Sequence, residues 1–584
     1  MSDRFAHAMP YGAQVMGDGR TRFRLWAPDV DEVAMVCAEA APEPMRALDD
    51  GWFECICAAP PDTRYRYRLG TGQTVPDPAS RQQHGGDVHG ASIVVDPRAY
   101  AWRFPEWQGR PWRDVVIYEL HVGLFGGFDG VAAALPRLAE LGVTAIELMP
   151  VAQFPGARNW GYDGVLPFAP AAAYGTPEEL KALVDEVHRL GMMVFLDVVY
   201  NHFGPDGNFL GAYASRFFNE ATHTPWGAAM DVAVPQVGDF FVHNALYWLE
   251  EYRFDGLRLD AVHELGNPGW LSSLAARIRS HTGDRHVHLM LENEANQARL
   301  LGPRRYEAQW NDDFHNAAHV VMTGETEGYY GAFTANPLEK LTRALAEGFV
   351  WQGEPMNGER RGESTRGLAP SCFVDFLQNH DQVGNRPFGD RLTTMVAAPV
   401  LDAAYALLLL SPAIPMLFMG EEWASRTPFL YFSDHQDEAL RDAVREGRRR
   451  EFAAFGGHVP WADPNDPKTF LLSMLSPAEA DRPEAVARQA LIRHLLGIRR
   501  EFVGPWLDEC RFEGACVLGE KALAASWLRD ADTRLRIYCN LGATAVPFEV
   551  SRIIAPTWLY GDPEAFVAGL LPPFATLACL ESMS

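Results

Sequence analysis

The sequence lacks an apolar run long enough to cross a membrane. A bilayer-spanning helix needs about 18 or more uninterrupted apolar residues. The nearest candidate, 403–420, is broken by Pro412 and Pro415 and preceded by Asp402, so we expect a buried helix and a strand there. The first residues, MSDRFAHAMPYG, also lack the apolar core of a secretory signal. We therefore expect no membrane partner and a cytoplasmic location.

Cysteine is scarce and shows no metal-binding pattern. Eight cysteines are scattered over 584 residues, with no CxxC pair and no histidine at the spacing of a zinc ligand. This pattern is typical of a reduced compartment in which the thiols are buried. It predicts neither a metal site nor a cofactor.

Positive charge is also in deficit. The chain has 51 Lys and Arg residues against 76 Asp and Glu residues, a formal charge of −25 at pH 7. Such a field repels the phosphates of nucleic acids and anionic lipids, so nucleic acid is not an expected partner. The composition indicates no particular oligomeric state. With 47% apolar residues, a chain of 584 residues is expected to form about two to four globular domains.

The pattern of the sequence divides the chain into three regions. Residues 1–100 alternate short β-type runs, such as RYRYRL, with Pro, Gly and Asp clusters, which predicts a carbohydrate-binding-like β-sandwich. Residues 101–503 alternate apolar strands with amphipathic helices. Residues 504–584 return to short strands and predict a small C-terminal β domain, again a sandwich.

The central region predicts an α/β fold with a parallel sheet covered by helices. Its strands have the continuous apolar character of strands buried on both faces. One helix should begin with Thr176 as N-cap, Pro177 and Glu179, and end at Gly191. A doubly wound sheet would show the same alternation. Polar residues at strand ends spread over about 300 residues favour a (β/α)8 TIM barrel. The apolar runs are VVIYELHVG, TAIELMPVA, MMVFLDVVY, GLRLDAV, VHLMLENE, FVDFLQNHD and IPMLFMGEE.

Two carboxylates at the ends of apolar strands are candidates for catalysis. In GLRLDAVH, Asp260 and Arg258 share a strand face, so the guanidinium would keep the carboxylate ionised and suited to be a nucleophile. In HLMLENE, Glu292 ends an apolar strand, a setting that would raise its pKa as a general acid requires. A structural Arg–Asp pair and a strand-end carboxylate are the alternatives, and Glu294 competes with Glu292.

Further polar clusters end two other strands. FVDFLQNHDQVGN carries His380 and Asp381, and DVVYNH carries Asp197, Asn201 and His202. Taken singly, each is also what an ordinary turn after a strand contains. A metal site at His202 would need ligands that the local sequence does not provide.

The order of these clusters, DxxxNH, GxRxD, Glu and NHD, resembles the α-amylase superfamily of glycoside hydrolases over the whole chain. The resemblance implies that Asp260 is the nucleophile, Glu292 the acid/base and Asp381 the carboxylate that stabilises the transition state by binding sugar hydroxyls. It implies a mainly structural role for Asp197. The implied or candidate substrate-binding residues are Tyr162 as a platform for a sugar ring, His202, Arg258, His263 and His380.

Longer phrases are similar to the malto-oligosyltrehalose trehalohydrolase family. They are IELMPVAQFPGARNWGYDGV, FLDVVYNHFGPDGNFL, QWNDDFHNAAHVVMTGE and MLFMGEEWASRTPFLYFSDH. LENEANQ departs from the family pattern and leaves the choice of Glu292 over Glu294 open. The resemblance implies retaining hydrolysis of the α-1,4 bond beside the terminal trehalose of maltooligosyltrehalose. A glycogen-branching or debranching enzyme acting on α-glucan is the alternative, and a catalytically silent glycan-binding barrel is a third.

The QWNDDFHN segment after the sixth strand is predicted to select trehalose. We expect Trp310 to pack on a sugar ring, and Asp312 and Asp313 to accept hydrogen bonds from sugar hydroxyls. The alternative is that Asp312 or Asp313 only caps the next helix.

Overall fold

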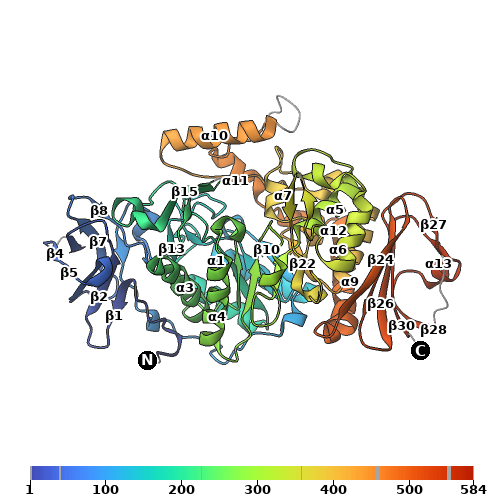
Figure 1. The fold of residues 1–584 in the computed structure, drawn as a ribbon, viewed down its shortest axis with the longest axis horizontal. Helices are drawn as coiled ribbons and strands as arrows, with labels where there is room; N and C mark the ends of the chain where they lie inside the picture. Colours follow the sequence, from blue (N-terminus) through green and yellow to red (C-terminus); the bar gives the residue numbers. More distant parts are fainter. Residues whose placement is uncertain are drawn as a thin grey trace.

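Three β-rich units follow one another along the chain. The computed structural model describes residues 3–38, 41–224, 226–356, 358–453, 461–548 and 554–582. Figure 1 shows the N-terminal strands at one end of the long axis, a barrel with its helices in the middle, and a C-terminal sheet at the other end. In the described parts of the chain, no helix combines the length and apolar character that crossing a membrane requires.

Two facing sheets make up the N-terminal unit. In β7 (Arg64–Leu69), Tyr65 and Tyr67 are buried and Arg64 and Arg68 are exposed, the alternation of a half-buried strand. The rings of Phe23 and Tyr65, from opposite sheets, lie 4.8 Å apart. One sheet has the order β1 (Gly12–Val15), β2 (Thr21–Trp26), β6 (Trp52–Cys57), β5 (Arg46–Ala47); the other has β4 (Glu43–Pro44), β3 (Val33–Cys37), β7, β8 (Thr74–Val75), with β9 (Ser92–Ile93) beside β7.

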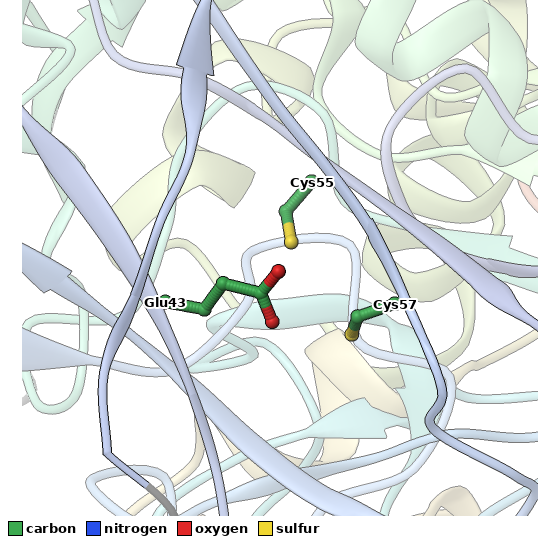
Figure 2. Close-up of side chains that lie close together, drawn as sticks. All are labelled: Glu43, Cys55 and Cys57. Carbon is green, nitrogen blue, oxygen red and sulfur yellow. The ribbon is translucent and has the colours of Figure 1, made fainter.

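All cysteines of the sequence are free thiols. The expectation that they are buried is wrong for Cys516, which is exposed on a C-terminal strand. Two others are not isolated, because Cys55 and Cys57 approach Glu43 between the N-terminal sheets (Figure 2).

The central unit is a closed parallel barrel, as predicted. Its strands are β10 (Ile117–Leu120), β11 (Ala145–Leu148), β14 (Met193–Val198), β17 (Gly256–Leu259), β18 (His288–Leu291), β19 (Ala308–Trp310), β22 (Phe373–Asp375) and β23 (Ile414–Phe418). The ring closes where β10 pairs with β23. Every residue of β17 and β18 is buried, because the interior of the barrel covers one face of each strand and helices cover the other. Parallel strands bring all their carboxyl ends to one mouth.

The helices surround the barrel, and α2 can be compared directly with its prediction. Thr176 Oγ1 accepts from the backbone N–H of Glu179 at 3.2 Å, and Glu179 Oε2 accepts from the N–H of Thr176 at 2.7 Å. α2 ends at Arg189, and Gly191 follows with φ of +69°. The longer barrel helices are α1 (Phe128–Leu141), α2 (Pro177–Arg189), α3 (Pro235–Glu250), α4 (Pro268–Thr282), α5 (Asp312–Thr323), α6 (Pro337–Glu347), α9 (Ala398–Leu410) and α12 (Pro483–Ile498).

The apolar segment 403–420 is the predicted helix and strand, α9 followed by β23. The C-terminal sheet packs on α9, where Thr576 Oγ1 donates to the carbonyl oxygen of Ala403 at 2.8 Å. Its order is β24 (Arg511–Gly519), β25 (Ala522–Leu528), β26 (Thr533–Asn540), β30 (Ala575–Ser582) and β28 (Ile554–Tyr560), beside the pair β27 (Val546–Pro547) and β29 (Leu570–Leu571).

Candidate active site

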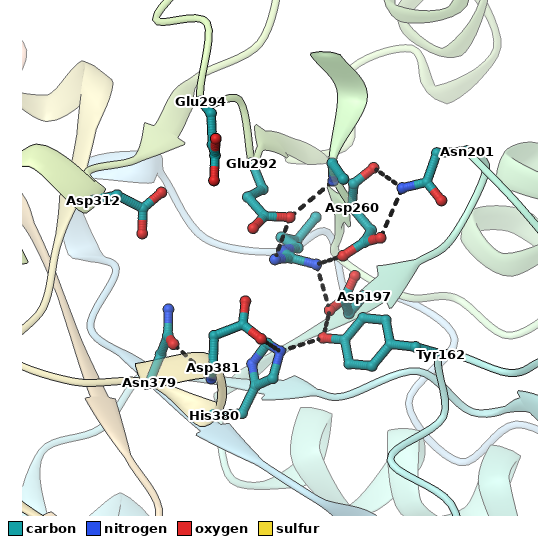
Figure 3. Close-up of polar contacts among 12 residues, drawn as sticks. Tyr162, Asp197, Asn201, Asp260, Glu292, Glu294, Asp312, Asn379, His380 and Asp381 are labelled. Atoms are coloured by element: carbon teal, nitrogen blue, oxygen red, sulfur yellow. Dashed lines mark hydrogen bonds and ion pairs between the residues drawn. The ribbon is translucent and has the colours of Figure 1, made fainter. Parts of the chain in front are cut away.

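The predicted catalytic carboxylates meet at the mouth of the barrel. Asp260 follows β17 and Glu292 follows β18, while Asp381 lies in the short helix α7 (His380–Gly384) beyond β22. Asn379 caps α7, and its Oδ1 accepts from the N–H of Asp381 at 2.9 Å. Figure 3 shows these side chains around one open space, as expected from strands that all end at the same face.

The guanidinium of Arg258 contacts the carboxyl groups of Asp197, Asp260 and Glu292. Its Nη1 donates to Asp197 Oδ2 and to Asp260 Oδ1, both at 2.7 Å, and its Nη2 lies 2.9 Å from Glu292 Oε2. The guanidinium is fully buried, with its Cζ 4.1 Å from the centre of the Trp310 ring. One buried cation therefore fixes three acidic groups in position and compensates part of their charge.

The pKa values of the two central carboxyls move in opposite directions. Burial opposes the ionisation of Asp260, but Arg258, His202 and the amide of Asn201 together lower its pKa. Burial raises the pKa of Glu292 well above its ordinary range, and the negative charges of Asp260 and Asp381 raise it further. The positive charge of Arg258 lowers it, but by less than the other effects raise it. These opposite directions favour an ionised Asp260 and a protonated Glu292, the states predicted for a nucleophile and a general acid.

One carboxyl oxygen of Glu292, Oε2, contacts two neighbouring groups. Oε2 accepts from the N–H of Ala261 at 2.8 Å and is the atom that meets Arg258. Ala261 adopts the left-handed conformation, with φ of +37°, in the turn that directs its N–H toward Glu292. Figure 3 shows the other oxygen turned toward the space between Asp312 and Asp381. That oxygen is the one placed to carry the proton.

Tyr162 and His380 line the site beside Asp381. The Tyr162 hydroxyl donates to Asp197 Oδ2 at 2.6 Å and accepts from His380 Nε2 at 2.8 Å, and the two rings stack at 5.2 Å. Burial opposes the charged form of His380, but Asp381 and Glu119 raise its pKa to about 9. Gly161, with φ of +108°, forms the turn before Tyr162, where a Cβ atom would lie 2.2 Å from the Pro150 carbonyl oxygen.

Asn201 and His202 follow β14, the third barrel strand, and both favour the ionised form of Asp260. Asn201 Nδ2 donates to Asp260 Oδ2 at 2.8 Å and to its backbone carbonyl at 3.0 Å. His202 Nε2 lies 3.0 Å from the carbonyl oxygen of Tyr162, and its ring stacks at 5.2 Å on the exposed ring of Trp226. Burial lowers the pKa of His202.

The three residues predicted to bind the trehalose unit, Trp310, Asp312 and Asp313, differ in exposure. The expectation for Trp310 is not supported, because its side chain is 1% exposed beneath Arg258 and presents no face to a sugar. Asp313, also 1% exposed, is not available either: its Oδ2 accepts from Asn296 and from the N–H groups of Val350 and Trp351 at 2.8–3.1 Å. Asp312 alone of the three is partly exposed and faces the site (Figure 3).

The capping alternative is also wrong as stated. The N-cap of α5 is Asn311, whose Oδ1 accepts from the N–H of Phe314 at 3.3 Å. Asp312 and Asp313 are the first residues inside the helix, where acidic side chains are favourable near the positive end of the helix dipole. Burial, with the charge of Glu294 nearby, raises the pKa of Asp312 to about 7.

His263 and Glu294 lie at the rim of the site. His263 Nδ1 accepts from the backbone N–H of Glu294 at 3.3 Å, so this histidine supports the loop after β18. Figure 3 shows Glu294 facing Asp312 across the opening, farther than Glu292 from Asp260. Glu292 therefore has the contacts expected of the acid, and Glu294 does not.

Two buried acids escaped the sequence prediction. Glu119 on β10 binds His380, with Oε1 2.5 Å from Nδ1 and Oε2 accepting the backbone N–H at 3.1 Å. Glu147 lies beside it on β11, and neither oxygen of its carboxyl has a hydrogen-bond partner among the described residues. Burial, with the charges of Asp197 and Glu119 nearby, raises the pKa of Glu147 well above its ordinary range and so favours the neutral carboxyl. The signal was a lone acid in each apolar run, IYEL and IELM.

Comparisons with known proteins agree with this geometry. The family model described as the alpha amylase catalytic domain matches residues 98–226. A malto-oligosyltrehalose trehalohydrolase of Deinococcus radiodurans is 42% identical over 83% of this chain and 82% of its own. A crystal structure from Salmonella typhimurium, described as a "Putative alpha Amylase", is 42% identical in sequence, with a TM-score of 0.93 and coverage of 98% of this chain and 100% of its own. A 1,4-alpha-glucan branching enzyme of Photobacterium profundum matches only 41% of this chain and 38% of its own, at 33% identity.

Proposed function

The chain belongs to the malto-oligosyltrehalose trehalohydrolase family, and from that premise we propose that it hydrolyses the α-1,4 glucosidic bond next to the terminal trehalose of maltooligosyltrehalose. The products are trehalose and a shortened maltooligosaccharide. The carboxyl groups and the arginine of the barrel mouth supply the chemistry, without a cofactor. Free cysteines throughout the sequence support a cytoplasmic location for the reaction.

In the first step, we assign attack to Asp260. Its ionised carboxylate attacks the anomeric carbon, the bond to the glycosidic oxygen breaks, and Glu292 gives its proton to that oxygen. The product is a covalent glycosyl–Asp260 ester and free trehalose. Asp381, whose side chain is 38% exposed, is available to accept hydrogen bonds from hydroxyls of the reacting sugar.

In the second step, the ionised Glu292 takes a proton from water. The water oxygen attacks the anomeric carbon and displaces the Asp260 carboxylate, so the enzyme returns to its starting protonation state. Two displacements at one carbon retain the α configuration. A retaining site requires carboxyl groups about 5–5.5 Å apart. We expect this spacing between Asp260 and Glu292, since one guanidinium contacts both.

One observation carries the proposal. Arg258 contacts both Asp260 and Glu292, yet the pKa of Asp260 is lowered and that of Glu292 is raised. Incubation with maltooligosyltrehalose and, separately, with a maltooligosaccharide of equal length tests the proposal. Chromatography should detect trehalose from the first substrate and much slower hydrolysis of the second. Equal rates on both substrates, with glucose or maltose as products, would contradict the choice of bond.

The alternative of a branching or debranching enzyme shares the same catalytic strands. In a branching reaction, a sugar hydroxyl replaces water in the second step. Analysis of an amylose digest for new α-1,6 bonds, and of a branched glucan for loss of them, distinguishes these activities. We expect neither change.

A further inference from the structure

A second cluster of reactive side chains lies in the N-terminal sandwich, outside the barrel. One carboxylate oxygen of Glu43 and the Sγ atoms of Cys55 and Cys57 all lie within 4.8 Å of one another. Figure 2 shows the Glu43 carboxylate directed between the two thiols. Glu43 is exposed, Cys55 is buried and Cys57 is half-buried, so the cluster sits at an edge of the sandwich that solvent can reach.

The strand pairing explains why these side chains converge. Cys55 and Cys57 are two residues apart on β6 and therefore project from one face of it. Glu43 on β4 pairs with Met35 on β3, in the opposite sheet. The cluster therefore joins β6 of one sheet to β4 of the other.

Cys37 borders the same cluster. On β3 it lies two residues beyond Met35, and its Sγ is 3.0 Å from Met35 Sδ. It is not one of the residues whose ligand atoms all lie within 4.8 Å of one another, so Cys37 flanks the cluster and does not belong to it.

We propose that Glu43, Cys55 and Cys57 form a binding site for a thiophilic divalent ion of the zinc type, with the fourth position left to water. Zinc sites take thiolate and carboxylate ligands in a tetrahedron, with Zn–S near 2.3 Å and Zn–O near 2.0–2.2 Å. The ligand atoms of such a tetrahedron lie about 3.5–3.8 Å apart. The observed ligand atoms lie within 4.8 Å of one another, so movements of about 1 Å would bring them to that spacing.

Binding of a divalent ion is coupled to loss of the thiol protons. A divalent ion stabilises the thiolates and displaces their protons, so its affinity falls with decreasing pH. Because the ligands come from two sheets, the ion stabilises the sandwich and takes no part in hydrolysis.

Metal binding by the full-length protein tests the proposal. The reduced chain is treated with a chelator, desalted, incubated with zinc sulfate and freed of excess metal, and its metal content is measured. We expect about one zinc per chain. Incubation with cobalt instead should give thiolate-to-cobalt charge-transfer absorption in the near ultraviolet and visible bands of a tetrahedral ion.

Variants locate the ion. Cys55→Ser and Cys57→Ser should lose the zinc and the charge-transfer absorption, and Glu43→Gln should bind at least about tenfold more weakly. Cys516→Ser is the matched control, because this thiol is exposed on a C-terminal strand, and it should bind like the unchanged protein. Zinc should also raise the melting temperature of the unchanged protein but not that of Cys57→Ser.

Two outcomes would overturn the proposal. One is a reduced, unchanged protein that retains less than about 0.1 zinc and gives no charge-transfer absorption with cobalt. The other is a folded Cys57→Ser protein that binds as much metal as Cys516→Ser. Trehalose release is a separate measurement, so either result leaves the proposed hydrolase activity unaffected.

Discussion

At the scale of single residues, the chemistry depends on how one arginine is shared. Arg258 contacts both Asp260 and Glu292, yet their pKa values move apart. Asp260 has His202 and Asn201 as additional partners that favour its charge. Glu292 instead lies near other carboxylates, whose negative charges add to the effect of burial, so its pKa rises. Unequal partners, rather than unequal contact with Arg258, separate the nucleophile from the acid.

The first prediction concerns the two carboxyls themselves. We expect Asp260→Asn and Glu292→Gln each to lower kcat by at least about 100-fold, because both substitutions keep the shape and remove the charge or the proton. Steady-state release of trehalose measures the loss, and circular dichroism checks the fold. Glu294→Gln is the matched control and should retain activity within about tenfold. An inactive Glu294→Gln beside an active Glu292→Gln would reverse the assignment of the acid.

The second prediction concerns pH. Asp260 must be ionised, and its lowered pKa favours this form; Glu292 must be protonated, and its raised pKa lets it keep the proton to higher pH than an ordinary glutamate does. The pH profile of kcat/KM should therefore fall on the alkaline side as Glu292 loses its proton. Asp312→Asn removes one of the charges that raise the pKa of Glu292, so this fall should move to lower pH by less than about one unit. A shift to higher pH would contradict the assignment.

At the scale of elements, the start of α5 combines two functions in adjacent residues. Asp313 ties the helix to the segment after α6, through the N–H groups of Val350 and Trp351 and an ion pair with Arg361 at 3.4 Å. Asp312, one residue earlier, turns to the open site, where Gln382 Nε2 donates to it at 3.4 Å. The helical rotation between consecutive residues separates the structural acid from the one that a sugar can reach.

The third prediction separates these two functions. Asp313→Ala should destabilise the protein by about 2–4 kcal/mol, because it leaves buried donors and Arg361 without their acceptor. Asp312→Ala should change the melting temperature little but lower the preference for maltooligosyltrehalose over a matched maltooligosaccharide, measured as a ratio of kcat/KM values. If the ratio is unchanged in a stable Asp312→Ala protein, another group selects trehalose.

Elements with strong local signals were predictable from the sequence. Seven of the eight barrel strands lie in the predicted apolar runs, and the boundaries of α2 follow from its capping residues; β19 (Ala308–Trp310) has no such run. Placement within the barrel was harder to predict. Glu119 and Glu147 lie inside apolar strands, and Trp310 ends a strand under Arg258, so only the closed ring shows what each side chain faces. The cluster around Cys55 escaped because Glu43 lies on β4 and the two cysteines on β6, and the sequence alone does not show that these strands meet.

At the scale of the whole molecule, the net charge of the chain has little influence on the buried catalytic groups. The formal charge of −25 is the sum over all 584 residues. The groups that set the state of the site are enclosed in the barrel: the side chain of Arg258 is fully buried, and those of Asp260 and Glu292 are 11% and 16% exposed. Salt screens such buried pairs far less than it screens surface charges.

The last prediction follows from this insulation. A maltooligosaccharide with a trehalose end carries no charge, so the acidic surface neither attracts nor repels it, and kcat/KM should vary by less than about twofold between 0.05 and 0.5 M NaCl. The rate of trehalose release at low substrate concentration measures this, and circular dichroism at each salt concentration is the control for unfolding. A steep change with an unchanged fold would mean that an exposed charge contributes to binding. Asp312, as the partly exposed acid facing the site, would then be the first residue to replace, and Asp312→Asn should remove the salt dependence.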